Sequence, residues 1–232
     1  PDDLANRLYA AFPDTDSMRL QKSLKEDKFT AYQMDKYDPL LGEAVYAFQE
    51  KKVIDLVSEI TEIENLLADD SLYLGGVSLM AKGQFLNPHV DNSHNESFTR
   101  YRRLNLLYYV SPKWKLDNGG NFELWDEGLS HPPRTIESRF NRMVVMATSR
   151  HSLHSVSPIV KDVRRCCISN YYFSTNSIDS KTYYHGTYFR GRPGQPVRDL
   201  ILRANVVLKR IIRMVNTTGY SDRTHLKRSG KN

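Results

Sequence analysis

The chain changes character near residue 70, and this change limits its fold more than any other feature of the sequence. Residues 44–68 carry apolar side chains at helical spacing, whereas the residues that follow hold short apolar runs separated by turn residues. The runs are 72–81, 104–110, 121–125, 143–147 and 166–173. Parallel α/β folds alternate helices with strands, so this order instead predicts a β-sandwich or barrel supported by helices.

Three stretches are predicted to be helical: a short helix at 3–11, a long amphipathic helix at 44–68 and a last helix at 196–215. The last helix starts with a proline, which suits a first turn. We therefore divide the chain into N-terminal helical support (1–70), a β core (71–176) and a C-terminal extension (177–232), all in one structural domain. We expect residues 217–232 to be a disordered, flexible tail.

The positive charge is concentrated at the C-terminal end. The chain has 33 Lys and Arg against 27 Asp and Glu, a net charge of +6. Residues 196–232 contain nine Lys and Arg and two Asp, a local charge of +7, so the rest of the chain sums to −1. We expect the apolar face of the last helix to pack on the domain or on a second subunit. The alternative is an anionic surface such as a membrane, nucleic acid or acidic glycan.

Cysteine content and hydropathy indicate the cellular compartment in which the protein is expected. Cys166 and Cys167 are adjacent, and neighbours on a strand point to opposite faces, which disfavours a disulfide between them. No apolar run approaches the roughly 18 residues that a membrane span needs, and no signal-peptide pattern opens the chain. We therefore expect a soluble, cytoplasmic protein with no transmembrane segment.

The stretch NPHVDN places a histidine and an aspartate two residues apart. On an extended strand His89 and Asp91 point to the same side, which supplies two ligands of a 2-His-1-carboxylate Fe(II) site. A third ligand must come from elsewhere, and SRHSLHSVSPI at 149–159 offers His151 and His154. A His-X-Asp pair alone is also common on protein surfaces, so this interpretation needs further motifs.

Five segments supply them: GQFLNPHVDN, YYVSPKW, DNGGNFELWD, HSVSP and RCCISNYYF. In this order they resemble the 2-oxoglutarate/Fe(II)-dependent dioxygenase superfamily, most closely its prolyl 4-hydroxylase-like branch. The resemblance covers roughly residues 72–175. It implies a double-stranded β-helix, or jelly roll. The expected fold is therefore mainly β, with a jelly roll buttressed by N-terminal helices and a C-terminal helix.

The resemblance implies that His89, Asp91 and His154 are the iron ligands and catalytic residues. It favours His154 over His151 because His154 begins HSVSP. Related halogenases lack the carboxylate, so the presence of Asp91 favours hydroxylation or desaturation. The sequence departs from the family where a frequent tyrosine is replaced by Met80 and a frequent tryptophan by Tyr171.

The resemblance also implies residues for the cosubstrate. Arg165 would bind the far carboxylate of 2-oxoglutarate, because a guanidinium offers a buried anion two parallel hydrogen bonds. Arg164 is its rival. Tyr109 aligns with a family tyrosine whose hydroxyl contacts the same carboxylate. Ser169 lies four residues after Arg165 on the same strand face, so its hydroxyl is a further candidate contact.

The segment after the His-X-Asp pair often lies near the substrate in this family. Asn92, His94 and Arg103 are therefore candidate substrate-loop residues. The alternative interpretation is that Arg100, Arg102 and Arg103 belong to a solvent-exposed loop without a role in binding.

The resemblance implies hydroxylation of an unactivated C–H bond, with O2 consumed and 2-oxoglutarate decarboxylated to succinate and CO2. Fe(II) would be the metal, and ascorbate would keep it reduced. The first substrate expected is a prolyl residue of a peptide or protein, or free proline. The alternative is another small molecule: an amino acid, a sugar or a natural-product intermediate. Rivals from other classes are a non-catalytic jelly roll that binds nucleic acid through its basic tail, and a cupin-like metal protein without 2-oxoglutarate.

Overall fold

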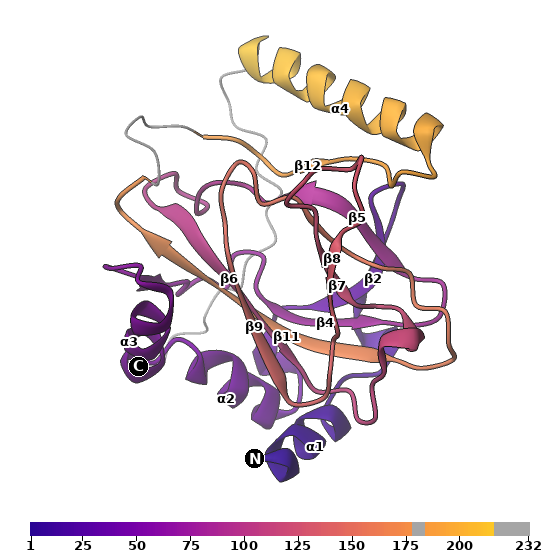
Figure 1. The fold of residues 1–232 in the computed structure, drawn as a ribbon. Helices are drawn as coiled ribbons and strands as arrows, with labels where there is room; N and C mark the ends of the chain where they lie inside the picture. Colours follow the sequence, from indigo (N-terminus) through magenta and orange to yellow (C-terminus); the bar gives the residue numbers. More distant parts are fainter. Residues whose placement is uncertain (178–183, 216–232) are drawn as a thin grey trace.

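A computed structural model describes residues 1–177 and 184–215 of the chain. Within them, one antiparallel sheet of twelve strands curls into a half-barrel, with the strand order β8-β7-β10-β5-β2-β4-β11-β6-β9 (Figure 1). In addition to this order, β1 pairs with β2, β12 with β5 and β3 with β11. The strands are β1 (Arg19–Lys22), β2 (Glu26–Ala31), β3 (Leu67–Ala68), β4 (Gly76–Met80), β5 (Phe85–Val90), β6 (Tyr101–Tyr109), β7 (Phe122–Leu124), β8 (Arg134–Ile136), β9 (Arg142–Ala147), β10 (His154–Val156), β11 (Arg165–Ser174) and β12 (Tyr188–Phe189).

The described helices flank this sheet on two sides. They are α1 (Asp2–Ala10), α2 (Pro39–Ala47), α3 (Lys51–Thr61) and α4 (Pro196–Val215), with short 3-10 turns at Thr15–Ser17, Met34–Lys36 and Leu116–Asn118. Helices α1 to α3 lie together, and α4 lies over β12 at the opposite side of the molecule (Figure 1). This arrangement confirms the expected mainly β, jelly-roll-like fold with flanking helices. No described helix is both long enough and apolar enough to cross a membrane.

The main core lies between the N-terminal helices and one face of the sheet. Leu8 of α1 and Leu41 of α2 pack against Leu79 of β4 and Ile168 of β11, and all four side chains are almost completely buried. Burial of each such side chain stabilises the fold by about 2 kcal/mol. Because alternate residues of β11 face opposite sides, Arg165 and Cys167 point away from this core, toward the interior of the half-barrel.

The predicted long helix at 44–68 is wrong. Helix α2 begins earlier, where the Asp38 side chain accepts a hydrogen bond from the backbone N–H of Leu40 and Pro39 opens the first turn. The chain then leaves the helix at 48–50, where the carbonyl of Phe48 accepts a hydrogen bond from the Tyr172 hydroxyl. Tertiary contact with β11 therefore interrupts a pattern that is continuous in sequence.

The second helix of the pair, α3, also ends before the predicted boundary. Glu62 ends it in the left-handed conformation, with φ 55°. Residues 67–68, predicted as the last helical turn, instead form β3 and pair with Tyr172 and Phe173 of β11.

Residues 1–70 supply strands as well as helices. The β1–β2 hairpin falls in a segment without a clear period, and β2 lies in the sheet between β5 and β4. Its sequence, EDKFTA, is largely polar, so no apolar alternation indicated a strand. The run at 72–81 becomes a strand only from Gly76, because Leu72 and Leu74 adopt positive φ angles. Helix α4 has the predicted limits, and the tail predicted at 217–232 lies outside the described residues.

Candidate metal centre

Three predicted ligands meet where β5 and β10 pair. His154 lies directly opposite His89 in the strand register, and Asp91 follows the end of β5. The Nε2 atom of His89 lies 3.5 Å from Asp91 Oδ1, and Nε2 of His154 lies 3.7 Å from Asp91 Oδ2. The possible ligand atoms all lie within 4.8 Å of one another. These residues, named the His-Asp-His cluster below, are at least nine-tenths buried.

Backbone contacts orient both imidazoles toward a common point. Nδ1 of His89 lies 2.9 Å from the carbonyl oxygen of Asn87, and Nδ1 of His154 lies 2.9 Å from that of Ser152. In the tautomer that donates these hydrogen bonds, each Nε2 keeps a free lone pair on the side of Asp91. The pKa of His154 is lowered to about 4 by burial and by the neighbouring His89, so this imidazole is neutral at physiological pH.

Asp91 completes the donor set with a negative charge. Burial alone would raise the pKa of this carboxyl, but its interactions with His89, His154 and the buried Arg102 guanidinium outweigh burial and hold the pKa well below its usual range. Its Oδ2 is buried and has no hydrogen-bond partner in the described part of the chain. Two imidazoles and a carboxylate are a donor set suited to Fe(II), and the Asp91 oxygen that has no hydrogen-bond partner fits a bound cation.

The predicted cosubstrate anchor is buried in the same half-barrel. Arg165 opens β11 and is 3% exposed. Its Nε donates to Ser138 Oγ at 3.1 Å, its Nη1 lies 3.7 Å from Met80 Sδ, and its guanidinium lies 4.8 Å from the centre of the Tyr109 ring. No described carboxylate forms an ion pair with it. A buried guanidinium without an anionic partner fits a ligand that brings a carboxylate.

Tyr109 and Ser169 differ in how ready they are for such a ligand. The Tyr109 hydroxyl is buried and has no described hydrogen-bond partner, and burial raises its pKa to about 12, so it remains protonated and able to donate. The Ser169 hydroxyl already donates to the carbonyl of Gly76 at 3.3 Å. Ser169 shares the inner strand face with Arg165, but its role in binding remains a prediction.

The structure places the two alternative site residues, Arg164 and His151, away from the interior of the half-barrel. Arg164 points away from the interior, toward α1, where its Nε donates to the Tyr9 hydroxyl at 3.1 Å. His151 is exposed on the loop before β10 and does not belong to the His-Asp-His cluster. Arg165 and His154 are therefore the members of each pair that face the interior.

Arg102 was expected in a solvated loop, and this is wrong. It lies in β6, its side chain is fully buried, and its Nη1 lies 3.5 Å from Asp91 Oδ2. Its guanidinium stacks on Tyr171 at 3.8 Å, and none of its side-chain nitrogens has a hydrogen-bond partner in the described part of the chain.

A β-bulge explains how Arg102 reaches the interior. Between Tyr172 and Phe173 the pairing of β11 with β6 shifts by one residue, so that Phe173 faces Arg102 and Arg103 is left unpaired. Strand alternation counted back from Tyr109 would have placed Arg103 inside. Arg103, a candidate substrate-loop residue, instead donates from Nη1 to the carbonyl of Asn176 at 3.4 Å. The basic run RYRR was visible in the sequence, but the bulge was not.

The other two loop candidates pack against the C-terminal extension. The backbone N–H of Asn92 donates to Thr187 Oγ1 at 3.2 Å. His94 stacks on Phe98 at 3.9 Å and meets the edge of Tyr184. The loop after Asp91 is therefore held by residues 184–187, and no contact shown here assigns these side chains to a substrate.

One contact with the metal centre was missed entirely. Phe189 of β12 stacks on the His89 imidazole, with ring centroids 4.9 Å apart and planes 14° apart. The strand β12 pairs with β5, so the C-terminal extension covers one side of the His-Asp-His cluster. The only available signal was an aromatic pair, Tyr188 and Phe189, in a Gly- and Pro-rich stretch.

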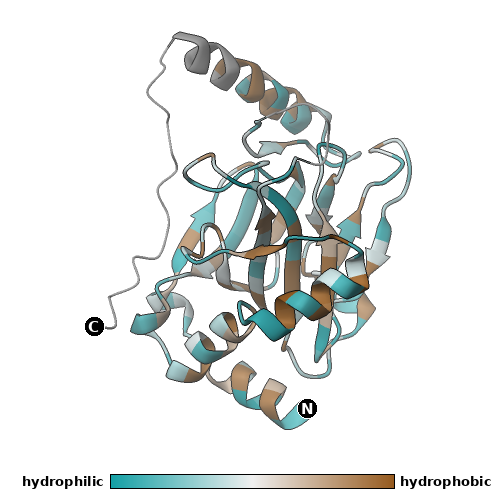
Figure 2. Ribbon diagram, turned by 90° about the vertical axis from the view of Figure 1, so that its left-hand side faces the viewer, coloured by the Kyte–Doolittle hydropathy of each residue, from teal (hydrophilic) through white to brown (hydrophobic). Residues whose placement is uncertain are grey.

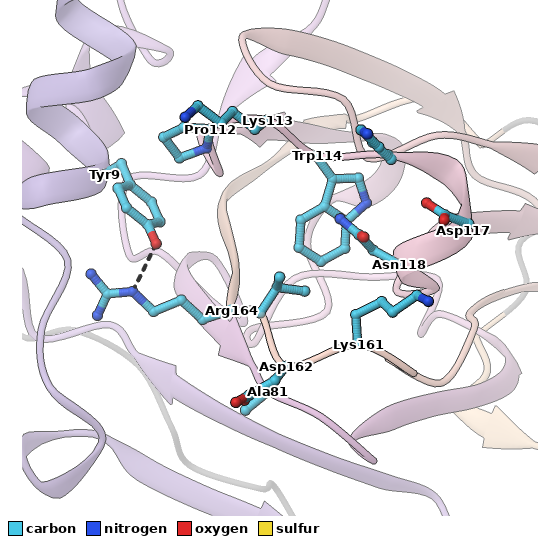
Figure 3. Close-up of a pocket in the computed structure, with 12 residues that line it drawn as sticks. Tyr9, Ala81, Pro112, Lys113, Trp114, Asp117, Asn118, Lys161, Asp162 and Arg164 are labelled. Carbon is cyan, nitrogen blue, oxygen red and sulfur yellow. Dashed lines mark hydrogen bonds between the residues drawn. The ribbon is translucent and has the colours of Figure 1, made fainter.

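A cavity of about 750 Å³ lies elsewhere, on the outer side of β11 (Figure 3). Its lining includes Tyr9, Trp114, Lys161 and Arg164, and Arg164 reaches the Tyr9 hydroxyl across it (Figure 3). It contains no member of the His-Asp-His cluster. Because Arg164 and Arg165 project to opposite sides of the strand, this cavity is distinct from the candidate metal centre.

Comparison with known proteins agrees with this geometry. Residues 75–173 match the family model of the 2OG-Fe(II) oxygenase superfamily. Similar solved structures include a prolyl-4-hydroxylase from Pseudomonas putida, with 15% identity over 75% of this chain and 88% of that chain and a TM-score of 0.56. The viral collagen prolyl hydroxylase of Paramecium Bursaria Chlorella virus-1 is 13% identical over 75% of this chain and 91% of that chain, with a TM-score of 0.51. HygX from Streptomyces hygroscopicus, with nickel, 2-oxoglutarate and hygromycin B bound, is 10% identical over 75% of this chain and 80% of that chain, with a TM-score of 0.50.

At these identities the solved structures support the fold, and the family match supports the chemistry. No match was found among the curated proteins. The matched segment contains the whole His-Asp-His cluster together with Arg102, Tyr109 and Arg165. Residues 75–173 therefore form a domain that matches the 2OG-Fe(II) oxygenase superfamily, a family of dioxygenases that use Fe(II) as metal and 2-oxoglutarate as cosubstrate.

Proposed function

We propose that this dioxygenase hydroxylates an unactivated C–H bond and that His89, Asp91 and His154 hold its iron. The observation that carries this proposal is the convergence of two Nε2 atoms and one carboxylate within 4.8 Å in a buried site. When bound there, Fe(II) would keep open coordination positions for 2-oxoglutarate and O2 and supply the oxidising chemistry. Retention of Asp91 supports hydroxylation, because the carboxylate occupies a position that a halide would otherwise need.

The remaining residues would position the cosubstrate. Arg165 would form charge-assisted hydrogen bonds to the far carboxylate of 2-oxoglutarate, and the Tyr109 hydroxyl would donate to the same group. The Tyr109 hydroxyl is buried without a hydrogen-bond partner in the described residues, so donation to a bound ligand would remove a desolvation cost that the free enzyme carries. Arg102 would hold Asp91 in place through its ion pair.

For the substrate, a prolyl residue of a peptide or protein, or free proline, is the first choice. Five motifs in the order of prolyl hydroxylases support it, and two solved prolyl hydroxylases share the fold. The second candidate is a small molecule that carries its own carboxylate, such as a free amino acid. The fully buried Arg102 favours it, because its guanidinium has no hydrogen-bond partner in the described residues and lies beside the cluster.

The iron assignment is tested by anaerobic titration of the apoprotein with Fe(II) and 2-oxoglutarate, followed by the visible charge-transfer band of the complex. We expect the band in the wild type and in His151→Ala, and its loss in His154→Ala. A band that survives His154→Ala would overturn the ligand assignment.

The substrate is tested separately with prolyl peptides, free proline and other free amino acids. The measurements are succinate formation and a mass gain of one oxygen atom in the substrate. Turnover of peptides alone would support the first choice, and turnover of free amino acids alone would support the second.

A further inference from the structure

Helix α4 exposes its apolar face. Val197, Leu200, Ile201, Ala204 and Leu208 share one side of the helix by their spacing. Val197 is 70% exposed, Leu200 68% and Leu208 55%. The expectation that this face packs on the domain is therefore not met by the described residues. In Figure 2, α4 stands apart from the sheet, and the coloured part of the helix carries hydrophobic residues.

The helix is held to the domain by its opposite side. The Asp199 carboxylate accepts hydrogen bonds from Arg190, at 2.7 Å from Nε and 3.1 Å from Nη2, and from the backbone N–H of Gly191 at 2.8 Å. The Arg198 guanidinium lies 5.2 Å from the centre of the Phe85 ring. Leu202 is 3% exposed, the one buried apolar side chain among residues 197–208. At 100° per residue, Asp199 and Leu202 lie opposite the apolar stripe and Arg198 lies at its flank.

This attachment has a built-in close contact. A Cβ atom on Gly191 would lie 2.7 Å from the Asp199 backbone nitrogen and 2.8 Å from the Gln195 carbonyl oxygen. Only glycine therefore allows the chain before α4 to approach its first turn so closely. The polar side is clamped to the domain, and the apolar stripe is turned outward as a consequence.

The positive charge of the C-terminal segment indicates which kind of partner would cover the apolar face of α4. Residues 196–232 carry a net charge of +7, and the one acidic side chain in α4, Asp199, is already paired with Arg190. A second copy would bring two strongly basic segments together, which is repulsive. Nucleic acid would satisfy the charge but leave the aliphatic stripe in water. An anionic lipid surface satisfies both, since acyl chains cover the stripe and headgroups pair with the basic side chains.

We propose that α4 is an interfacial helix that binds an anionic lipid bilayer, with Val197, Leu200, Ile201, Ala204 and Leu208 facing the lipid. The helix lies along the bilayer rather than across it, because its other face is charged and is clamped to the domain. The membrane then lies at the side of the molecule where β12 borders the metal centre (Figure 1).

The test uses the full chain and sedimentation with two kinds of vesicle, phosphatidylcholine alone and an equal mixture with phosphatidylglycerol. We expect binding to the mixed vesicles only, and weaker binding as salt is raised. Leu208→Asp should weaken binding by about tenfold or more, because it removes apolar area and adds a repelled charge. The matched control is Leu116→Asp: Leu116 is 56% exposed and lies outside α4, so the same new charge there should leave binding unchanged.

Several results would overturn the proposal. Absence of binding to the mixed vesicles would do so, as would equal binding by Leu208→Asp and the wild type. A stable dimer that Leu208→Asp dissociates would show that a second copy covers the stripe. Tighter binding to nucleic acid than to vesicles, unchanged in Leu208→Asp, would show that charge alone drives the contact. Because α4 is outside the metal centre, succinate formation should be the same in all variants, which separates this test from that of the proposed function.

Discussion

At the scale of the residue, the adjacent side chains of Arg164 and Arg165 lie in different surroundings. Arg164 contacts Tyr9 on the outer side of β11, and Arg165 enters the interior beside Tyr109. Strand alternation enforces this division, because neighbouring side chains leave a strand on opposite faces. Their chemistry is identical, so only their surroundings distinguish the roles that we propose for them.

The prediction at this scale concerns the affinity for 2-oxoglutarate. Arg165→Ala should raise the KM for 2-oxoglutarate about thirtyfold or more, because truncating one partner of a buried, hydrogen-bonded charge pair costs roughly 2–5 kcal/mol. Arg164→Ala is the matched control and should leave that KM unchanged. Steady-state succinate formation at varied 2-oxoglutarate measures both. Equal effects of the two variants would mean that Arg165 is not the anchor.

At the scale of the element, the curled sheet depends on close approach between β2 and β4. Gly76 opens β4 with φ 116°, and a Cβ atom there would lie 2.5 Å from the carbonyl oxygen of Ala31. Position 76 therefore needs glycine both for its backbone angle and for space. Gly83, at φ 86°, needs it for the angle alone, because no atom lies within 4 Å of a Cβ atom built there.

The pair of glycines offers a controlled comparison of stability. We expect Gly76→Ala to lower the free energy of unfolding by about 2 kcal/mol more than Gly83→Ala, since both substitutions strain the backbone but only the first forces β2 away from β4. Urea denaturation at equilibrium measures the difference. Similar losses in the two variants would show that β2 can shift without cost.

At the scale of the whole molecule, the residues proposed to bind iron and 2-oxoglutarate come from distant parts of the sheet. His89 and Asp91 lie at the end of β5, His154 opens β10 and Arg165 opens β11. Iron and 2-oxoglutarate would therefore bind the folded chain and not the unfolded one. Binding of this kind stabilises the native state by mass action.

The corresponding prediction is a ligand-dependent melting temperature. At a hundred times the dissociation constant, Fe(II) with 2-oxoglutarate should stabilise the wild type by about 2.7 kcal/mol under anaerobic conditions. For a domain of this size that corresponds to a rise of roughly 5–10 °C. Removal of the metal with a chelator should reverse the rise, and His154→Ala should abolish it. A rise of the same size in His154→Ala would place the metal elsewhere.

Local patterns in the sequence were sufficient for several features, because those features depend on neighbouring residues. A side-chain period of two places His89 and Asp91 on one side, and a helical period with an initial proline defines α4 with its observed limits. The order of apolar runs and turns indicates short strands after helices. The choice of His154 and Arg165 needed more, because it relied on family resemblance, which carries information about the fold.

Only the tertiary structure decided the features that depend on contacts between distant residues. The continuous apolar pattern at 44–68 breaks where Tyr172 contacts Phe48, and the polar strand β2 exists because β4 and β5 pair with it on either side. The bulge in β6 turns Arg102, and not Arg103, toward the interior. The period of a strand predicts alternating faces, but it does not predict where the pairing with a neighbouring strand shifts by one residue. The outward face of α4 is likewise set by Arg190 and Gly191, because a helical pattern defines an apolar side without saying which way that side will face.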